Sequence, residues 1–149
     1  MNRVARRGLC LLLVTQVAAA AAVHAAVTPA QASRFLAQAS LGADYAEIQR
    51  TARIGPNLWL KDQFTRPIGY HQPLLDQRLR SGLEVTSEHR RWSWWQQVMK
   101  GPDPLRQRVA LALSEIFVVS DNADAVASNP IGATNYYDML LRNAFGNYR

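Results

Sequence analysis

The stretch LRQRVALALSEIFVVS, residues 105–120, decides the fold that this sequence predicts. Asp103 and Pro104, which precede it, are typical of the first turn of a helix. Within it, apolar residues recur at the i, i+3, i+4, i+7 spacing of one helix face: Val109, Ala112, Leu113 and Ile116. Residues 116–119 are apolar on every side, so we expect other elements to surround that end. The stretch therefore predicts a central buried helix over residues 105–119.

Start and stop signals divide the rest of the chain into further short helices. Thr28 with Gln31, and Asp44 with Glu47, are spaced as capping boxes. Thr134 is a candidate cap for a last helix that ends near Gly146. Other helical segments are expected at residues 57–64, 74–80 and 87–100. Because no stretch alternates as a strand does, we expect an all-α fold, an irregular bundle of about seven short helices around the central helix.

The N-terminus has the pattern of a secretory signal peptide. Arg3, Arg6 and Arg7 precede an apolar run over residues 9–22, and small or tolerated residues follow at the cleavage positions 23–25. The run is shorter than the roughly 20 residues that a membrane span needs. We expect residues 1–25 to be removed, by the general or the twin-arginine route, leaving no stable membrane span. The predicted location is periplasmic or extracellular, and residues 26–149 are predicted to be one helical domain.

Composition excludes several classes of function. Residues 1–25 hold three of the 17 basic residues and none of the 11 acidic ones, so residues 26–149 carry a net charge of +3. That charge is too small to indicate nucleic-acid binding. The single cysteine, Cys10, lies in the predicted signal, so neither disulfides nor thiol chemistry are expected in the processed chain.

No motif in the sequence predicts catalysis, a cofactor or a metal. After residue 25 the only histidines are His71 and His89, and we expect surface positions for both rather than metal ligation. Asp121 and Asp124 lie close together in the stretch SDNAD, which offers oxygen ligands for a cation such as calcium. Turn formation and helix capping explain the same composition. Asp138 joins these two acids as a possible member of a carboxylate pair.

The residues that we single out for ligand binding are aromatic and basic. Trp92, Trp94 and Trp95 lie within four positions, and neighbouring residues point about 100 degrees apart on a helix. We expect Trp92 and Trp95 to pack in the core and Trp94 to line a groove or an interface. Arg106 and Arg108 lie where the helix dipole disfavours cations, so we expect acids of a neighbouring helix, water or an anionic ligand to compensate.

Three longer segments carry a resemblance to a known family. RFLAQASLGADYAEI at residues 34–48, residues 105–120, and YYDMLLRNAFGNYR at residues 136–149 resemble the bacterial family catalogued as domain of unknown function 1800. The resemblance covers residues 32–149. It implies a mostly helical, exported protein longer than this chain, without an agreed activity, often encoded beside a partner that resembles sulfatases. The chain is therefore expected to be the N-terminal part of a larger family domain.

Three functions follow as hypotheses, each with its own expectation. The first is an exported scaffold or accessory module, which predicts no pocket with convergent titratable groups. The second is part of a secreted hydrolase, which predicts that Asp121, Asp124 or Asp138 faces a cleft. The third is a carbohydrate or cell-envelope binding module that uses Trp94.

Overall fold

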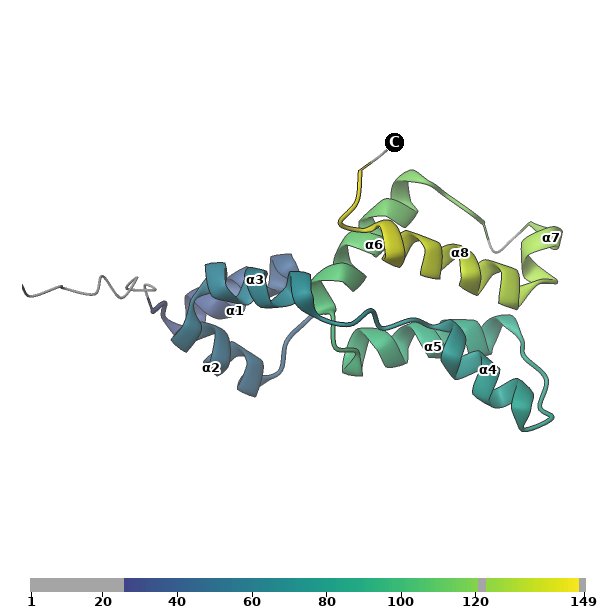
Figure 1. Ribbon diagram of the computed structural model, residues 1–149, viewed down its shortest axis with the longest axis horizontal. Coiled ribbons are helices and arrows are strands. Elements are labelled where there is room, and N and C mark those ends of the chain that lie inside the picture. Colours follow the sequence, from purple (N-terminus) through teal and green to yellow (C-terminus); the bar gives the residue numbers. More distant parts are fainter. Residues whose placement is uncertain (1–25, 121–122, 148–149) are drawn as a thin grey trace, which may run out of the picture.

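The computed structural model describes residues 26–120 and 123–147, and within them the chain is all-α, as predicted (Figure 1). It forms eight helices and no strand in these ranges: α1 Pro29–Ala39, α2 Tyr45–Ile54, α3 Pro56–Thr65, α4 Gln72–Arg80, α5 Ser87–Lys100, α6 Pro104–Ile116, α7 Asp124–Ala127 and α8 Pro130–Asn143. The four-residue α7 lies in a stretch without a predicted helix. The predicted signal peptide lies outside the described residues.

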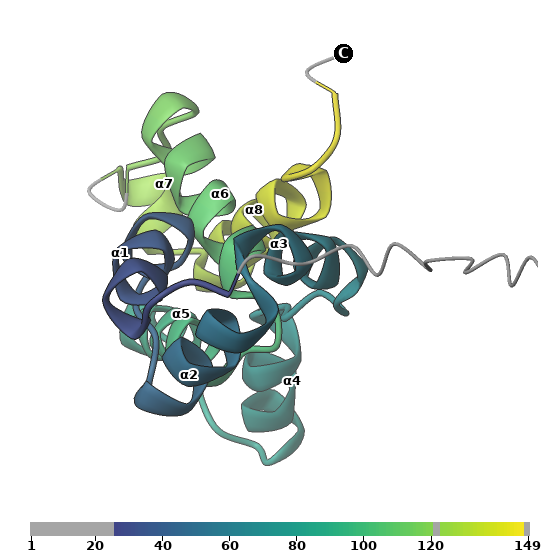
Figure 2. The same ribbon diagram turned by 90° about the vertical axis from the view of Figure 1, so that its left-hand side faces the viewer.

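The helices form two groups that α6 joins. Helices α1, α2 and α3 pack together at one end of the molecule, while α4, α5, α7 and α8 lie at the other (Figures 1 and 2). Helix α6 contacts α1 and α3 in the first group and α5 and α8 in the second. The stretch predicted to lie at the centre of the fold therefore does occupy the centre.

The buried face of α6 is not the one predicted. Its buried residues are Arg106, Gln107 and Ala110, whereas Ile116 is 70% exposed and Val118 is 71% exposed. The helix ends at Ile116, so the expectation of a buried helix through residue 119 is wrong. The reason is a neighbour that periodicity does not reveal, because the polar face of α6 packs against an irregular segment with its own buried backbone groups.

That segment is the link between α3 and α4, and three long polar side chains hold it. Gly69 donates its N–H to Asp103 Oδ2 at 3.0 Å, and its carbonyl accepts from Gln107 Nε2 at 2.9 Å. The carbonyl of Tyr70 accepts from Gln97 Nε2 at 2.8 Å. Buried backbone groups without hydrogen-bond partners cost free energy, so these side chains supply the hydrogen bonds that a β-sheet or a helix would otherwise provide.

The apolar core is small and divided between the two groups. Ala110 of α6 packs with Leu140 and Leu141 of α8. In the other group Trp59 is fully buried, and the rings of Trp59 and Phe35 meet edge to face at 5.3 Å. Of the predicted core around residues 109–119, Ala110 belongs to the first cluster and Leu113 is partly buried against it, whereas residues 116–118 are exposed.

Two of the predicted helix caps, Thr28 and Asp44, are confirmed, whereas Asp103 is the N-cap of α6 but makes no side-chain cap bond. Thr28 and Gln31 form the reciprocal capping box of α1, and the Asp44 side chain accepts from the N–H of Glu47 at 2.7 Å. The prediction for Thr134 is wrong, because α8 begins at Pro130 and Asn129 caps it. Thr134 lies one turn inside the helix, where its hydroxyl donates to the carbonyl of Pro130 at 2.8 Å.

An ion-pair cluster joins α2 to α3. Asp62 Oδ2 accepts from Arg50 at 2.9 Å and from Arg66 at 2.7 Å. Burial alone would raise the pKa of Asp62, but hydrogen bonds from the two guanidinium groups outweigh it and hold that pKa below its ordinary value.

Candidate functional site

Three neighbouring cavities lie along α5 on the side that faces α8. We call them the outer cavity, the aromatic hollow and the inner cavity, and their volumes are about 500, 240 and 10 Å³. Arg91 lines both the outer cavity and the aromatic hollow. Arg90, Trp94 and Tyr137 line both the aromatic hollow and the inner cavity. The shared residues make the three cavities one series, which we call the α5 groove.

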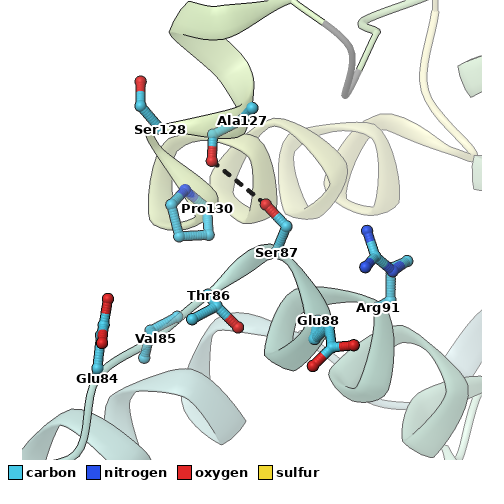
Figure 3. A pocket seen from close by; sticks show the side chains of 9 residues that line it. All are labelled: Glu84, Val85, Thr86, Ser87, Glu88, Arg91, Ala127, Ser128 and Pro130. Carbon is cyan, nitrogen blue, oxygen red and sulfur yellow. Dashed lines mark hydrogen bonds between the residues drawn. The ribbon is translucent and has the colours of Figure 1, made fainter.

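The outer cavity lies between the start of α5 and the junction of α7 with α8 (Figure 3). The Ser87 hydroxyl donates to the carbonyl of Ala127 at 3.3 Å across it. Its charged lining residues, Glu84, Glu88 and Arg91, are exposed. Thr86 Oγ1 and the ring nitrogen Nδ1 of His89 are 2.8 Å apart at the first turn of α5. The outer cavity thus offers carboxylates, hydroxyls and a guanidinium together.

The aromatic hollow is lined by flat side chains and two arginines. Its residues come from three helices: Arg90, Arg91, Trp94 and Trp95 of α5, Leu111 of α6 and Tyr137 of α8. The rings of Trp94 and Trp95 meet edge to face, with centroids 4.8 Å apart and planes at 77°. Trp95 is 55% exposed, and the Arg90 guanidinium lies 5.3 Å from the centre of the Tyr137 ring. Indole and phenol rings present apolar faces together with polar edges, which suits ligands that have both.

The inner cavity holds the buried pair His71 and Asp138. His71 Nδ1 lies 2.7 Å from Asp138 Oδ1, and the two residues are 3% and 4% exposed. The carboxylate also accepts the backbone N–H of His71 at 2.9 Å and that of Gln72 at 3.0 Å. A carboxylate oxygen is an acceptor, so in the neutral imidazole the Nδ1 beside it is the donor and Nε2 is the acceptor. Among the described residues Nε2 has no hydrogen-bond partner.

The first turn of α4 explains why these two residues meet. His71 is the N-cap of α4 but provides no side-chain cap, and Asp138 of α8 accepts the first N–H groups of that helix instead. A carboxylate at a helix N-terminus also interacts favourably with the helix dipole. Our prediction that His71 lies on the surface is therefore wrong, because residue 138 lies 67 positions away and periodicity does not pair it with the link.

The tryptophan predictions are right for one residue and wrong for two. Trp94 is half-buried and lines the aromatic hollow, in line with a groove position. Trp92 is 51% exposed and Trp95 is 55% exposed, so neither packs in the core. Helix α5 instead buries Arg90 and Ser93, because the face toward α4 and α8 is the one that carries these two residues.

The structure does not bring the two predicted ligand arginines together. Arg106 is 8% exposed, donates to the carbonyl of Leu141 at 3.0 Å and lies 4.2 Å from the centre of the Phe145 ring. Asp103, at the N-cap of the same helix, lies 3.8 Å from its Nε. Compensation thus comes from the cap residue of its own helix, a carbonyl and a ring, and not from acids of a neighbouring helix. Arg108 is exposed on the opposite face of α6.

Of the acidic candidates, the structure describes Asp124 and Asp138, which lie on different helices. Asp124 is exposed at the start of α7, and Asp121 lies outside the described residues. No group of three metal-ligating side chains occurs within residues 26–120 and 123–147. In the same ranges, no helix combines the length and the apolar character required to span a bilayer.

Sequence reasoning missed most of the α5 groove. Glu84, Glu88, Arg90, Arg91 and Tyr137 carry no motif, and they meet only because α5 packs beside α8. One available signal was the cluster of tryptophans beside two consecutive arginines.

Comparisons with known proteins place the chain at the level of a family. Neither the search of curated proteins nor the search of solved structures found a match. The family model described as "Protein of unknown function (DUF1800)" matches residues 34–149. That match covers most of the chain and all of the α5 groove, and the chain therefore belongs to this family of unknown function.

Proposed function

We propose that this chain is a saccharide-binding module of an exported protein, with the α5 groove as its binding site. The observation that carries the proposal is the aromatic hollow, in which an exposed Trp95 and a half-buried Trp94 lie beside Tyr137 and two arginines. Sugar rings present C–H faces that stack on aromatic rings and hydroxyls that pair with charged groups. The hollow offers both kinds of contact.

The outer cavity extends the same chemistry along α5. Glu84 and Glu88 are acceptors, Arg91 is a donor, and the hydroxyl of Ser87 lies between them. Charges of both signs favour a polyhydroxylated ligand over a strongly anionic one. A surface with titratable groups that converge on a cavity also favours ligand binding over a purely structural scaffold.

Export and partnership belong to the proposal and rest on sequence. The residues predicted to form the signal peptide, 1–25, support delivery to the periplasm or beyond. A periplasmic location would place the groove among cell-envelope glycans. The partner that resembles sulfatases, which the family resemblance implies, is also part of this proposal.

The test compares two tryptophans of one helix. Purified chain is incubated with insoluble xylan, cellulose, chitin or peptidoglycan, and the bound fraction is measured after sedimentation. We expect retention on at least one of these polymers and a loss of tenfold or more in affinity for Trp95→Ala. Trp94→Ala should also reduce retention.

Trp92→Ala is the matched control. Trp92 has nearly the same exposure as Trp95 but lines none of the three cavities. Its removal should leave retention unchanged. Equal losses for Trp92→Ala and Trp95→Ala, or no retention of the parent chain on any polymer, would contradict the proposal.

A further inference from the structure

We infer that His71 is a catalytic base, positioned by Asp138, that hydrolyses acyl esters carried by a glycan bound in the α5 groove. The inference rests on the proposed function and assigns to the groove a reaction in addition to binding. It starts from the buried acceptor Nε2, which has no partner among the described residues, and from the inner cavity, which His71 lines and which is large enough for one water molecule.

The pairing of the imidazole determines the kind of chemistry. A carboxylate on Nδ1–H fixes the tautomer and leaves the Nε2 lone pair directed away from the carboxylate, which is the arrangement of a general base. Cleavage of a glycosidic bond uses two carboxyl groups that flank the bond. Here the carboxylate is 4% exposed and accepts from His71 and Gln72, so it orients the base and does not face the ligand.

Neither of the two hydroxyls that line the inner cavity, those of Ser93 and Thr134, serves as the nucleophile. The Ser93 hydroxyl is fully buried and donates to the carbonyl of Arg90 at 2.7 Å. Thr134 likewise donates to the carbonyl of Pro130 at 2.8 Å. With both hydroxyl hydrogens engaged, water is the group that His71 Nε2 activates.

The reaction balances with water as the only co-reactant. Nε2 takes a proton from water while the water oxygen bonds to the acyl carbon. The bond between the acyl carbon and the sugar oxygen then breaks, and the sugar oxygen receives the proton from the imidazolium. The products are a carboxylic acid and a free sugar hydroxyl, and His71 returns to its neutral form.

The shape of the groove selects a small acyl group on a larger sugar. The aromatic hollow accommodates the sugar ring, and its shared boundary with the inner cavity consists of Arg90, Trp94 and Tyr137. The inner cavity has a volume of only about 10 Å³, which the water molecule fills, so the acyl carbon must reach that water from the aromatic hollow. A short acetyl group demands less room there than a long acyl chain.

The test measures acetate released from acetylated xylan by the full chain, with 4-nitrophenyl acetate as the small ester. His71→Asn deletes Nε2 but retains a side-chain amide that can donate to Asp138 as Nδ1 does. We expect it to lower kcat/KM at least 100-fold, about the usual contribution of a general base. His89→Asn removes the other described imidazole, which lies outside the three cavities, and should leave kcat/KM unchanged.

The role of Asp138 has its own measurement. In ¹⁵N spectra of the imidazole, the parent chain should show His71 protonated on Nδ1, and Asp138→Asn should shift the proton toward Nε2 while lowering kcat/KM. Circular dichroism of each variant shows whether it folds.

The outcomes separate this inference from the proposed function. No acetate release above buffer, or equal release by His71→Asn, would overturn the catalytic role even if xylan is retained through Trp95. Hydrolysis of 4-nitrophenyl acetate that depends on His71, without retention or deacetylation of xylan, would refute the glycan substrate. An Nε2-protonated His71 in the parent chain would refute the assignment of the base.

Discussion

Helix α6 buries a polar face, and this leads to a prediction that reverses the usual rule of burying apolar side chains. Gln107 is 2% exposed, and its amide donates to the carbonyl of Gly69 at 2.9 Å and to Asp103 Oδ1 at 3.2 Å. Ile116, on the same helix, is 70% exposed. We expect Gln107→Leu to destabilise the protein and Ile116→Ser to leave its stability nearly unchanged.

The magnitude follows from the groups that lose their donor. Gln107→Leu would leave a buried carbonyl and one oxygen of a fully buried carboxylate without that partner, and each such loss costs about 1 to 3 kcal/mol. Burial of the leucine side chain returns part of this cost, so the net loss should be about 2 to 4 kcal/mol. Ile116→Ser should stay within about 0.5 kcal/mol, as is usual for an exposed position. Glutamine and leucine have similar helix propensities, so propensity does not explain the difference.

Urea denaturation followed by far-ultraviolet circular dichroism gives both free energies of unfolding. With a slope of about 2 kcal/mol per molar, Gln107→Leu should lower the midpoint by about 1 to 2 M. Arg108→Leu is the matched control, because it introduces the same side chain at the next, exposed position of α6. Suppose instead that Gln107→Leu is as stable as the parent chain while Ile116→Ser loses about 2 kcal/mol or more, well beyond the usual surface effect. The apolar face of α6 would then be the buried one, and the polar interface between α6 and the link would be refuted.

Two further predictions concern the link and the ion-pair cluster. A Cβ at Gly69 would lie 2.8 Å from Asp103 Oδ1 and 2.8 Å from Gln97 Oε1, so Gly69→Ala should cost about 1 to 3 kcal/mol of unfolding free energy in the same urea assay. At Gly82 a Cβ meets open space but φ is +71°, so Gly82→Leu should cost about 1 to 2 kcal/mol through backbone strain alone. A cost near zero at Gly69 would contradict the close packing of the link. Because the pKa of Asp62 is lowered in the folded chain, its stabilising effect is complete above the ordinary value of 3.8 and is lost as the pH falls through the folded value. Asp62→Asn should therefore be less stable than the parent near neutral pH, by about 0.2 to 1 kcal/mol for so exposed a pair, and the difference should vanish in acid. A stability difference that grows as the pH falls would contradict the direction of the pKa shift.

Local signals in the sequence determined the secondary structure. The capping residues Thr28 and Asp44, the prolines in first turns and the break at residues 101–104 each act within about four positions, so they specify helix boundaries without help from the rest of the chain. The all-α class follows from them. The motifs of residues 34–48, 105–120 and 136–149 likewise sufficed to indicate the family.

The sequence also identified one residue of the α5 groove correctly. Trp94 was expected in a groove because three tryptophans so close together on a helix cannot all face one partner. The assignment of its neighbours Trp92 and Trp95 to the core failed for the same reason that the prediction for α6 failed. Hydrophobicity indicates which face of a helix prefers burial but not which face finds a partner, and here α5 and α6 pack through Arg90, Ser93 and Gln107.

Only the tertiary structure decided which polar groups are buried together. Asp138 meets His71 across 67 residues, and Asp103 meets Gly69 across 34, because an irregular link crosses the interior and its backbone groups need partners. No local pattern encodes such pairs, since their spacing along the chain depends on how the helices are arranged. The sequence by itself thus determined the all-α class and where most of the longer helices begin, and the packing of the helices decided which of their faces became the core and which became the α5 groove.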